Sequence, residues 1–128
     1  MPIMSVRAQS ALAVCLVMHR VQDENHGTPV TAIDLAIESG FSVSYIEQVI
    51  ADLRVSGIVS GVRGPGGGYR VRGDATIAEL LRAMDKDWDM LRDTKLPCVE
   101  RVRFKIDNFL KDITLEEITE SCKASKAA

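Results

Sequence analysis

The feature that most constrains the fold of this chain is a glycine-rich stretch between two short segments with the character of β-strands. Residues 64–68 read Gly-Pro-Gly-Gly-Gly, and they separate Ile58–Arg63 from Tyr69–Arg72. Glycine supplies the positive φ values that a tight reversal of the chain needs. The sequence therefore predicts a β-hairpin over residues 58–72 that carries arginines on its strands.

A helix with one buried side is predicted immediately before the hairpin. Apolar residues recur every three or four positions from Ile46 to Leu53, which is the spacing of a helix with one apolar stripe. The opposite face is polar, and either Ser42 or Ser44 can cap the helix start while Gly57 can end it. A polar-faced helix followed at once by an arginine-bearing hairpin is the layout of a winged helix-turn-helix.

Two further helices are predicted ahead of this unit. Residues 6–21 are apolar on nearly all sides, which is typical of a helix buried between others, and the turn formers of residues 22–29 end it. Thr31 opens the next helix with Asp34 three residues on, as in a capping box, and Gly40 closes it at the short spacing of a helix-turn-helix. The residues of this second helix expected to face inward are Ile33, Ala36 and Ile37.

The segment after the hairpin is also predicted to be helical. Thr76 and Glu79 form a second capping-box pattern, and apolar residues continue at helical intervals as far as Trp88, before a loop over residues 89–97. Beyond this loop, apolar residues alternate at steps of three and four, the seam of a helix that packs against another helix. The seam residues, predicted to form a dimer interface, are Val99, Val102, Ile106, Phe109 and Ile113.

This seam has two explanations. The core of a chain of 128 residues is already built from the earlier helices, so a symmetric second copy is the expected cover. The alternative is a stripe buried within the same chain. One more short helix is predicted at 114–122, followed by a frayed tail. We therefore divide the chain into a winged helix-turn-helix domain at 1–85, a connecting loop at 86–97, and a dimerisation helix and tail at 98–128.

Composition narrows the class of protein. No apolar run approaches the roughly 20 residues that cross a bilayer, and the N-terminus lacks the features of a signal peptide, so we expect a cytoplasmic protein without a membrane partner. The net charge is −2, which is unusual for a protein that binds a polyanion. Residues 41–72, however, hold four arginines against two acidic residues. The positive charge is thus local, and binding to nucleic acid would depend on geometry and backbone amides as much as on bulk charge.

Four segments of the chain resemble a known family. They are Phe41-Ser-Val-Ser-Tyr-Ile-Glu-Gln48, Leu53-Arg-Val-Ser-Gly-Ile-Val-Ser60, Val62-Arg-Gly-Pro-Gly-Gly-Gly-Tyr69 and, after the long helix, Asp112-Ile-Thr-Leu-Glu116. They resemble the bacterial winged-helix repressors of the Rrf type, a family that includes IscR, NsrR and CymR, and the resemblance covers nearly the whole chain. It implies a homodimer whose long helices pack together and whose two recognition helices enter successive major grooves of a palindromic DNA operator.

The expected DNA contacts lie on the polar face of the recognition helix, residues 42–55, and on the wing, residues 62–69. Ser44 and Gln48 can reach base edges, and Glu47 can accept a hydrogen bond from cytosine, which makes it a specificity residue. Arg63 is placed to enter a narrow minor groove. The full set of predicted DNA-binding residues is Ser42, Ser44, Tyr45, Glu47, Gln48, Arg54, Arg63, Gly64, Pro65, Gly66, Gly67, Gly68 and Tyr69.

Structural roles would explain some of the same residues. One of Ser42 and Ser44 has to cap the helix in any case, and Glu47 could be a solvated surface charge. The glycine stretch could be an ordinary hairpin turn. A nucleotide-binding loop is only weakly indicated, because no Lys-Ser or Lys-Thr follows and the stretch lies between strands instead of before a helix.

The signal that such a regulator would sense is a separate question. Relatives resembling IscR and NsrR hold an iron–sulfur cluster through three closely spaced cysteines before the long helix. This chain has only Cys98 there, so no cofactor or metal is expected, because cluster irons need several thiolate or imidazole ligands. Cys98, near Arg101, is instead a candidate thiol redox sensor. The alternatives are a ligand set completed by the partner's first helix, where Cys15 and His19 are one turn apart, a small-molecule pocket at Trp88, a protein effector, or cysteines without a role in sensing.

Two other functional classes compete with a DNA-binding regulator. A winged-helix module that binds proteins would have the same fold but no salt-dependent affinity for DNA. An enzyme is disfavoured, because no nucleophile–base pair, carboxylate pair or metal-ligand cluster stands out in the sequence.

Overall fold

The computed structural model describes residues 4–85 and 96–127 of the chain. In this part it contains the helices α1 (Val6–Glu24), α2 (Ala32–Ser39), α3 (Val43–Val55), α4 (Ile77–Met84), α5 (Pro97–Lys111) and α6 (Leu115–Ala127), and the strands β1 (Val59–Val62) and β2 (Gly68–Val71). The mainly helical fold with a two-stranded wing is the one predicted from the sequence. None of the described helices is long and apolar enough to span a membrane.

Side-chain caps set the boundaries of the helix-turn-helix. The hydroxyl of Thr31 accepts a hydrogen bond from the amide of Asp34, and Gly40 ends α2 with a φ of 80°. Ser42, not Ser44, caps α3 by accepting from the amide of Tyr45. These caps begin α2 and α3 and end α2 at residues that the sequence predicts to be helix boundaries. The end of α1 is the exception, since it continues to Glu24 instead of stopping at Val21.

Helix α2 is oriented differently from the sequence-based prediction. Its one buried residue is Leu35, and Ala36 is half-buried, but Ile33 and Ile37 are 63% and 76% exposed. Apolar residues are frequent on protein surfaces, so an isoleucine does not by itself define the inner face of a two-turn helix. The prediction that Ile33 and Ile37 face inward was wrong.

The wing is an antiparallel pair of strands that is fastened to the segment before α2. Val59 pairs with Val71 and Val62 pairs with Gly68 at the two ends of the ladder. A third strand-like contact comes from Val30, whose amide donates to the carbonyl of Tyr69 while its own carbonyl accepts from the amide of Tyr69, each at 2.8 Å. The wing therefore cannot swing freely relative to α2.

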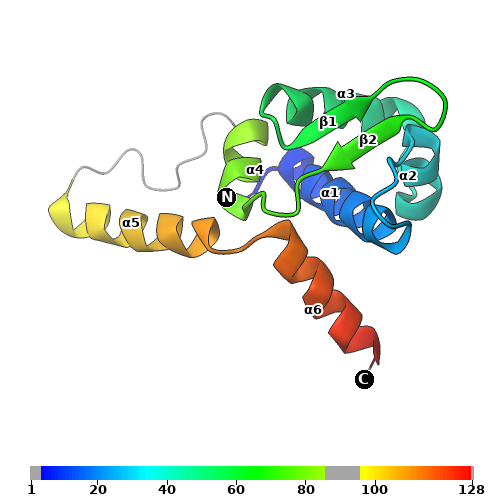
Figure 1. The fold of residues 1–128 in the computed structure, drawn as a ribbon. Helices are drawn as coiled ribbons and strands as arrows, with labels where there is room; N and C mark the ends of the chain where they lie inside the picture. Colours follow the sequence, from blue (N-terminus) through cyan, green and yellow to red (C-terminus); the bar gives the residue numbers. More distant parts are fainter. Residues whose placement is uncertain (1–3, 86–95, 128) are drawn as a thin grey trace.

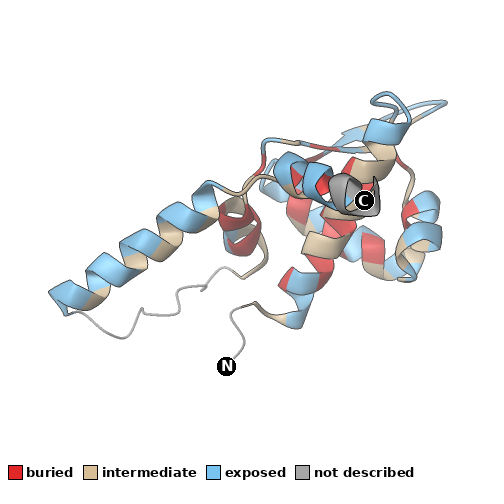
Figure 2. Cartoon of the chain, turned by 90° about the horizontal axis from the view of Figure 1, so that it is seen from below, coloured by how far each residue is buried: buried red, intermediate tan, exposed pale blue. Residues whose placement is uncertain are grey.

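Every described element except α5 contributes a buried residue to the hydrophobic core, and α5 touches it through the half-buried Leu110. Helix α1 runs through the centre, with Val14 and Met18 fully buried, and α3 and α4 pack against it (Figures 1 and 2). Leu115 at the start of α6 is also fully buried in this core. His19 of α1 shares a hydrogen bond of 2.9 Å with the hydroxyl of Thr119, so α6 is joined to α1 by polar as well as apolar contact.

Helix α5 projects from the body of the molecule (Figure 1). It contains no buried residue, and Figure 2 shows only half-buried and exposed positions along it. The predicted seam is divided: Val99, Ile106 and Ile113 are half-buried, while Val102 is 50% and Phe109 is 65% exposed. Of the connecting loop predicted at 86–97, residues 86–95, with Trp88, lie outside the described residues, and Pro97 is already the first residue of α5.

Candidate nucleic-acid interface

The outward face of α3 carries three exposed polar side chains that the sequence analysis singled out. Ser44, Glu47 and Gln48 are all exposed, while Ile46, Val49, Ile50 and Leu53 are buried on the opposite face. Tyr45 is half-buried, and its ring lies 5.5 Å from that of Phe41. Ser44, Glu47 and Gln48 are therefore free to contact a ligand, whereas Ser42 and Tyr45 also hold the start of the helix.

The turn of the wing depends on its glycines for two different reasons. Gly64 and Gly66 have φ values of 92° and 74°, which other residues rarely adopt. Gly67 is needed for space, because a Cβ atom there would lie 2.3 Å from the carbonyl oxygen of Val62. The result is a compact turn that leaves Arg63 and the tip of the wing exposed.

Gly68 has a role that the sequence did not indicate. Its φ is 153°, and a Cβ atom at this position would lie 2.6 Å from the carbonyl oxygen of Val30. The wing strand thus approaches the backbone before α2 more closely than any side chain allows. Val30 is the structural residue that sequence reasoning missed, because a single residue paired with a strand leaves no periodic signal.

An open hollow of about 500 Å³ lies between α3, the wing and the start of α2. Its lining brings the recognition helix and the wing together, since Glu47 and Arg54 from α3 line it together with Arg63 and Tyr69 from the wing. Thr31 and Ile33 line it from α2. Glu47 and the wing arginine, which the sequence analysis assigned to one surface, therefore share one concave site.

Arg54 joins α3 to the wing inside this hollow. A Cβ atom placed on Gly61 would lie 3.2 Å from Cζ of Arg54, so the guanidinium lies directly over this glycine of β1. Because Gly61 has no side chain, the arginine can cross from the end of α3 to the strand. Arg54 therefore braces α3 against β1.

Two arginines, Arg54 and Arg63, line the hollow against one acidic residue, Glu47, so the charge there is locally positive. Among the described residues, Arg63 and Arg70 have no carboxylate partner, whereas Arg72 pairs with Asp74 and with Glu79. Unpaired arginines on an exposed hairpin can contact phosphates without first breaking an ion pair. Asp52 is engaged by Arg7 of α1, so the acidic residue near the end of α3 is partly neutralised.

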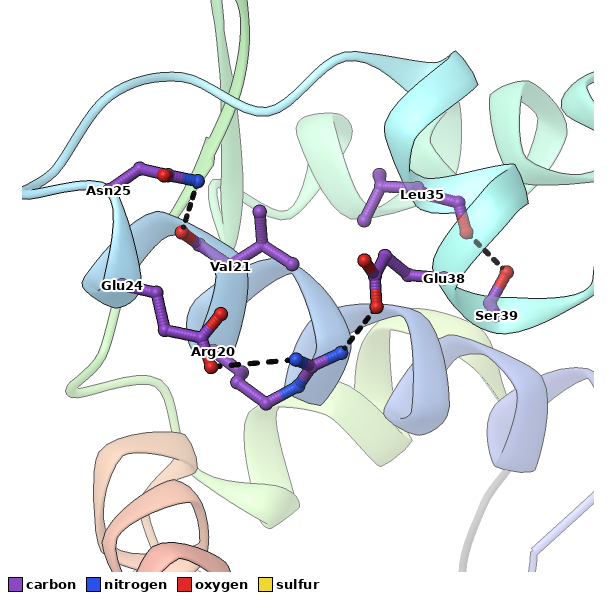
Figure 3. A network of polar contacts seen from close by, with 7 residues as sticks. All are labelled: Arg20, Val21, Glu24, Asn25, Leu35, Glu38 and Ser39. Carbon is purple, nitrogen blue, oxygen red and sulfur yellow. Dashed lines mark hydrogen bonds and ion pairs between the residues drawn. The ribbon is translucent and has the colours of Figure 1, made fainter.

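A network on the other side of α2 fixes this helix to α1 (Figure 3). Arg20 pairs with Glu38 of α2 at 2.9 Å and with Glu24 of its own helix at 3.5 Å. The hydrogen bond to Glu38 is the largest cause that raises the pKa of Arg20 above its ordinary value. In the same network, the hydroxyl of Ser39 donates to the carbonyl of Leu35. This network therefore fixes α2, the first helix of the helix-turn-helix, to α1.

The described cysteines and histidines do not form a metal site. Cys15 is buried, and burial raises the pKa of its thiol to about 12, so it remains protonated at neutral pH. Cys98 and Cys122 are exposed. Within residues 4–85 and 96–127, no three histidine, cysteine, aspartate or glutamate side chains lie close enough to hold a metal ion. His19 is buried and shares its hydrogen bond with the hydroxyl of Thr119.

Comparisons with known proteins agree with this arrangement. Residues 4–121 match the family model of Rrf2, described as an iron-dependent transcriptional regulator. The HTH-type transcriptional regulator IscR of Vibrio vulnificus strain YJ016 is 36% identical over an alignment of 106 residues that covers 71% of this chain and 63% of the relative. The chain thus spans about 63% of the length of this curated relative.

Solved structures support the same fold. IscR of T. potens superposes with a TM-score of 0.76 at 25% identity, over 98% of this chain and 91% of that one. CymR, the global cysteine regulator of B. subtilis, superposes with a TM-score of 0.73 at 21% identity, over 94% and 98% of the two chains. The family match extends over most of the chain, from α1 to α6. This protein belongs to the Rrf2 family of winged-helix transcriptional regulators.

Proposed function

We propose that this protein is a DNA-binding transcription regulator in which α3 enters the major groove while the wing reaches the adjacent minor groove. The observation that carries the proposal is the shared hollow, in which Glu47 and Arg54 of α3 lie opposite Arg63 and Tyr69 of the wing. A duplex that lies across this hollow would contact the helix and the wing at the same time. The family supports this function, since its members are described as transcriptional regulators.

Each exposed residue has a proposed role at this interface. Ser44 and Gln48 contact base edges, and glutamine can pair bidentately with adenine. Glu47 accepts from cytosine and repels phosphates elsewhere, so it selects sequence without adding affinity. Arg63 inserts into the minor groove, and the backbone of the glycine turn contacts phosphates. Arg54 contacts the sugar–phosphate backbone where α3 meets the wing.

We also propose that the protein acts as a homodimer. Val102 and Phe109 leave an apolar strip uncovered on α5, and a second copy related by a twofold axis would cover it. The axis would place two copies of α3 about 34–36 Å apart, which is one turn of DNA, so the operator would be palindromic. A dimer bound in this way at a promoter would block access to it, so we propose that the regulator is a repressor. Because such a repressor acts on DNA, we propose that it works in the cytoplasm.

The proposed DNA contacts are tested by selecting duplexes from a random library and measuring their affinity by fluorescence anisotropy across salt concentrations. Gln48→Ala should weaken binding mainly to the selected sequence, by about 1–3 kcal/mol. Arg63→Ala should weaken binding and lower the salt slope by about one. Arg101→Ala, which removes an exposed arginine of α5, is the matched control. If both interface variants bind like the parent at every salt concentration, these roles are wrong.

We infer further that this protein does not hold an iron–sulfur cluster. One thiolate from Cys98 cannot ligate a cluster that needs several, and the neutral thiol of Cys15 is enclosed in the core. Cys98 is instead the proposed redox-sensitive thiol, because it is exposed at the start of α5. Absorbance of the anaerobically purified protein tests the inference. A visible sulfide-to-iron band would overturn it.

A further inference from the structure

Within the part of the chain that the structure describes, helix α5 is attached to the body of the molecule near its C-terminal end. Just beyond its C-terminus, the carbonyl of Ile113 accepts from the amide of Ile77, and the amide of Leu115 donates to the carbonyl of Ala75, both at 3.0 Å. These backbone bonds clamp the end of α5 beside the start of α4. The rest of the helix runs away from the body (Figure 1). These bonds fix the position of one end of α5. The direction of the helix then depends on side-chain contacts farther along α5.

One ion pair lies where it can set this direction. Arg82 of α4 pairs with Asp107 of α5, which is more than one helical turn from the clamp. The Asp107 side chain is only 23% exposed, and it also accepts from Lys111 at 2.9 Å. Leu110, between these two residues of α5, packs against the core. Among the described residues, α4 is the main neighbour of α5 in the chain.

The charge of Asp107 is maintained at neutral pH. Its pKa lies below the ordinary carboxyl value, chiefly because Lys111 donates a hydrogen bond to it, and the charge of Arg82 acts in the same direction. The pair therefore persists as two charges under ordinary conditions. The Arg82–Asp107 pair thus joins α4 to α5 by charge as well as by packing.

Small rotations at this joint become large displacements at the far end of α5. The helix has 15 residues, which corresponds to a length of about 22 Å. A rotation of about 10° would move its far end by roughly 4 Å, close to the 3.4 Å rise of one base pair. If a partner subunit holds the exposed face of α5, the same rotation moves each α3 relative to the other.

We propose that the Arg82–Asp107 pair is a positioning contact that fixes the angle between α5 and the DNA-binding body, and thereby the spacing of the two operator half-sites that the dimer accepts. This inference rests on the proposed function as a dimeric DNA-binding regulator. Neither residue touches DNA. Their effect is transmitted through α4 on one side and α5 on the other.

The experiment compares three variants with the parent. Two are the single variants Asp107→Asn and Arg82→Gln. The third is a double variant that exchanges the two charges, with Arg82→Asp and Asp107→Arg in the same chain. Lys111→Gln is the control, because Lys111 lies on the same helix as Asp107 and its loss leaves the contact between helices in place. The side chain of Arg82 is 51% exposed, and an ion pair that is partly exposed adds little to stability, so all variants should fold. Circular dichroism and light scattering verify the fold and the oligomeric state before binding is measured.

Binding is measured on a series of duplexes in which two selected half-sites are separated by spacers that change one base pair at a time, and on a single half-site. The parent should prefer one spacer. In both single variants, the ratio of affinities between the best spacer and its neighbours should fall several-fold, while affinity for the single half-site stays unchanged. The double exchange should restore the preference, and Lys111→Gln should retain it.

The outcomes separate this inference from the function on which it rests. A parent that is monomeric or binds no duplex would overturn the proposed function and the inference with it. If the single variants are dimers that bind DNA with the spacer profile of the parent, only the positioning role of Arg82 and Asp107 is overturned. A loss of affinity that is equal on all spacers and on the single half-site would also overturn that role, since it would indicate a general structural effect.

Discussion

Replacing Gly68 with alanine tests the attachment of the wing most sharply. The strand β2 begins at this residue, and the added Cβ would lie 2.6 Å from the carbonyl oxygen and 2.8 Å from the carbonyl carbon of Val30. Both atoms belong to the backbone, so they cannot rotate away as a flexible side chain would. The wing and the segment before α2 must therefore separate in the Gly68→Ala variant.

The cost of this separation follows from the contacts that it breaks. Two backbone hydrogen bonds of 2.8 Å join Val30 to Tyr69, and each is worth about 0.5–1.5 kcal/mol. The φ of 153° at Gly68 adds about 1–2 kcal/mol of strain for any residue with a side chain. The Gly68→Ala variant should lose about 2–5 kcal/mol of the free energy of unfolding.

Gly64→Ala is the matched control. Gly64 also has a positive φ, 92°, but a Cβ atom there would meet nothing within 4 Å. The control should lose only the strain of about 1–2 kcal/mol. Urea denaturation of both variants at one protein concentration measures the difference. If Gly68→Ala is no less stable than Gly64→Ala, the close approach of the wing to Val30 does not exist in solution.

Three further predictions concern the core, the thiols and the acid response. Leu115→Ala should cost about 2–5 kcal/mol of unfolding free energy in urea denaturation, because Leu115 is fully buried. The control, Ile37→Ala, should change this free energy by less than about 0.5 kcal/mol, because Ile37 is exposed. Equal costs in the two variants would contradict the docking of α6. In a thiol-reagent titration, Cys15 should react only on unfolding while the other two cysteines react at once; three fast thiols would refute its burial. The lowered pKa of Asp107 implies stability that is complete above about pH 4 and is lost as the pH falls through the lowered value. The cost of Asp107→Asn should therefore shrink as the pH falls below about 4, and a cost that does not depend on pH would refute the ion pair.

The helix boundaries around the interface could be predicted because local chemistry sets them. Thr31 and Thr76 accept hydrogen bonds from the amides three residues on, and Gly40 ends α2, as their sequence patterns indicated. Caps involve neighbours in the chain, so the sequence contains both partners. The spacing of apolar residues every three or four positions, which predicted α3, is also confirmed, because all four residues of this apolar stripe are buried.

The contacts between distant segments could not be predicted. Ile33 and Ile37 resemble an inner stripe, but Leu35 occupies the core, and the face of α2 that packs inward depends on how the helix docks on α1. The closing of the wing by Val30 leaves no periodic trace in the sequence. Likewise, nothing local to α6 indicates that Leu115 joins the core of α1 and α4, since that depends on how the chain returns after α5.

The central claim is that α3 and the wing of each subunit bind one duplex together, at two sites related by a twofold axis. Hydroxyl-radical footprinting of the protein on its selected operator tests this claim directly. We predict two protected patches about one helical turn apart on one face of the duplex, flanked by minor-groove protection that Arg63→Ala removes. A single asymmetric patch, or an Arg63→Ala footprint identical to that of the parent, would contradict the account.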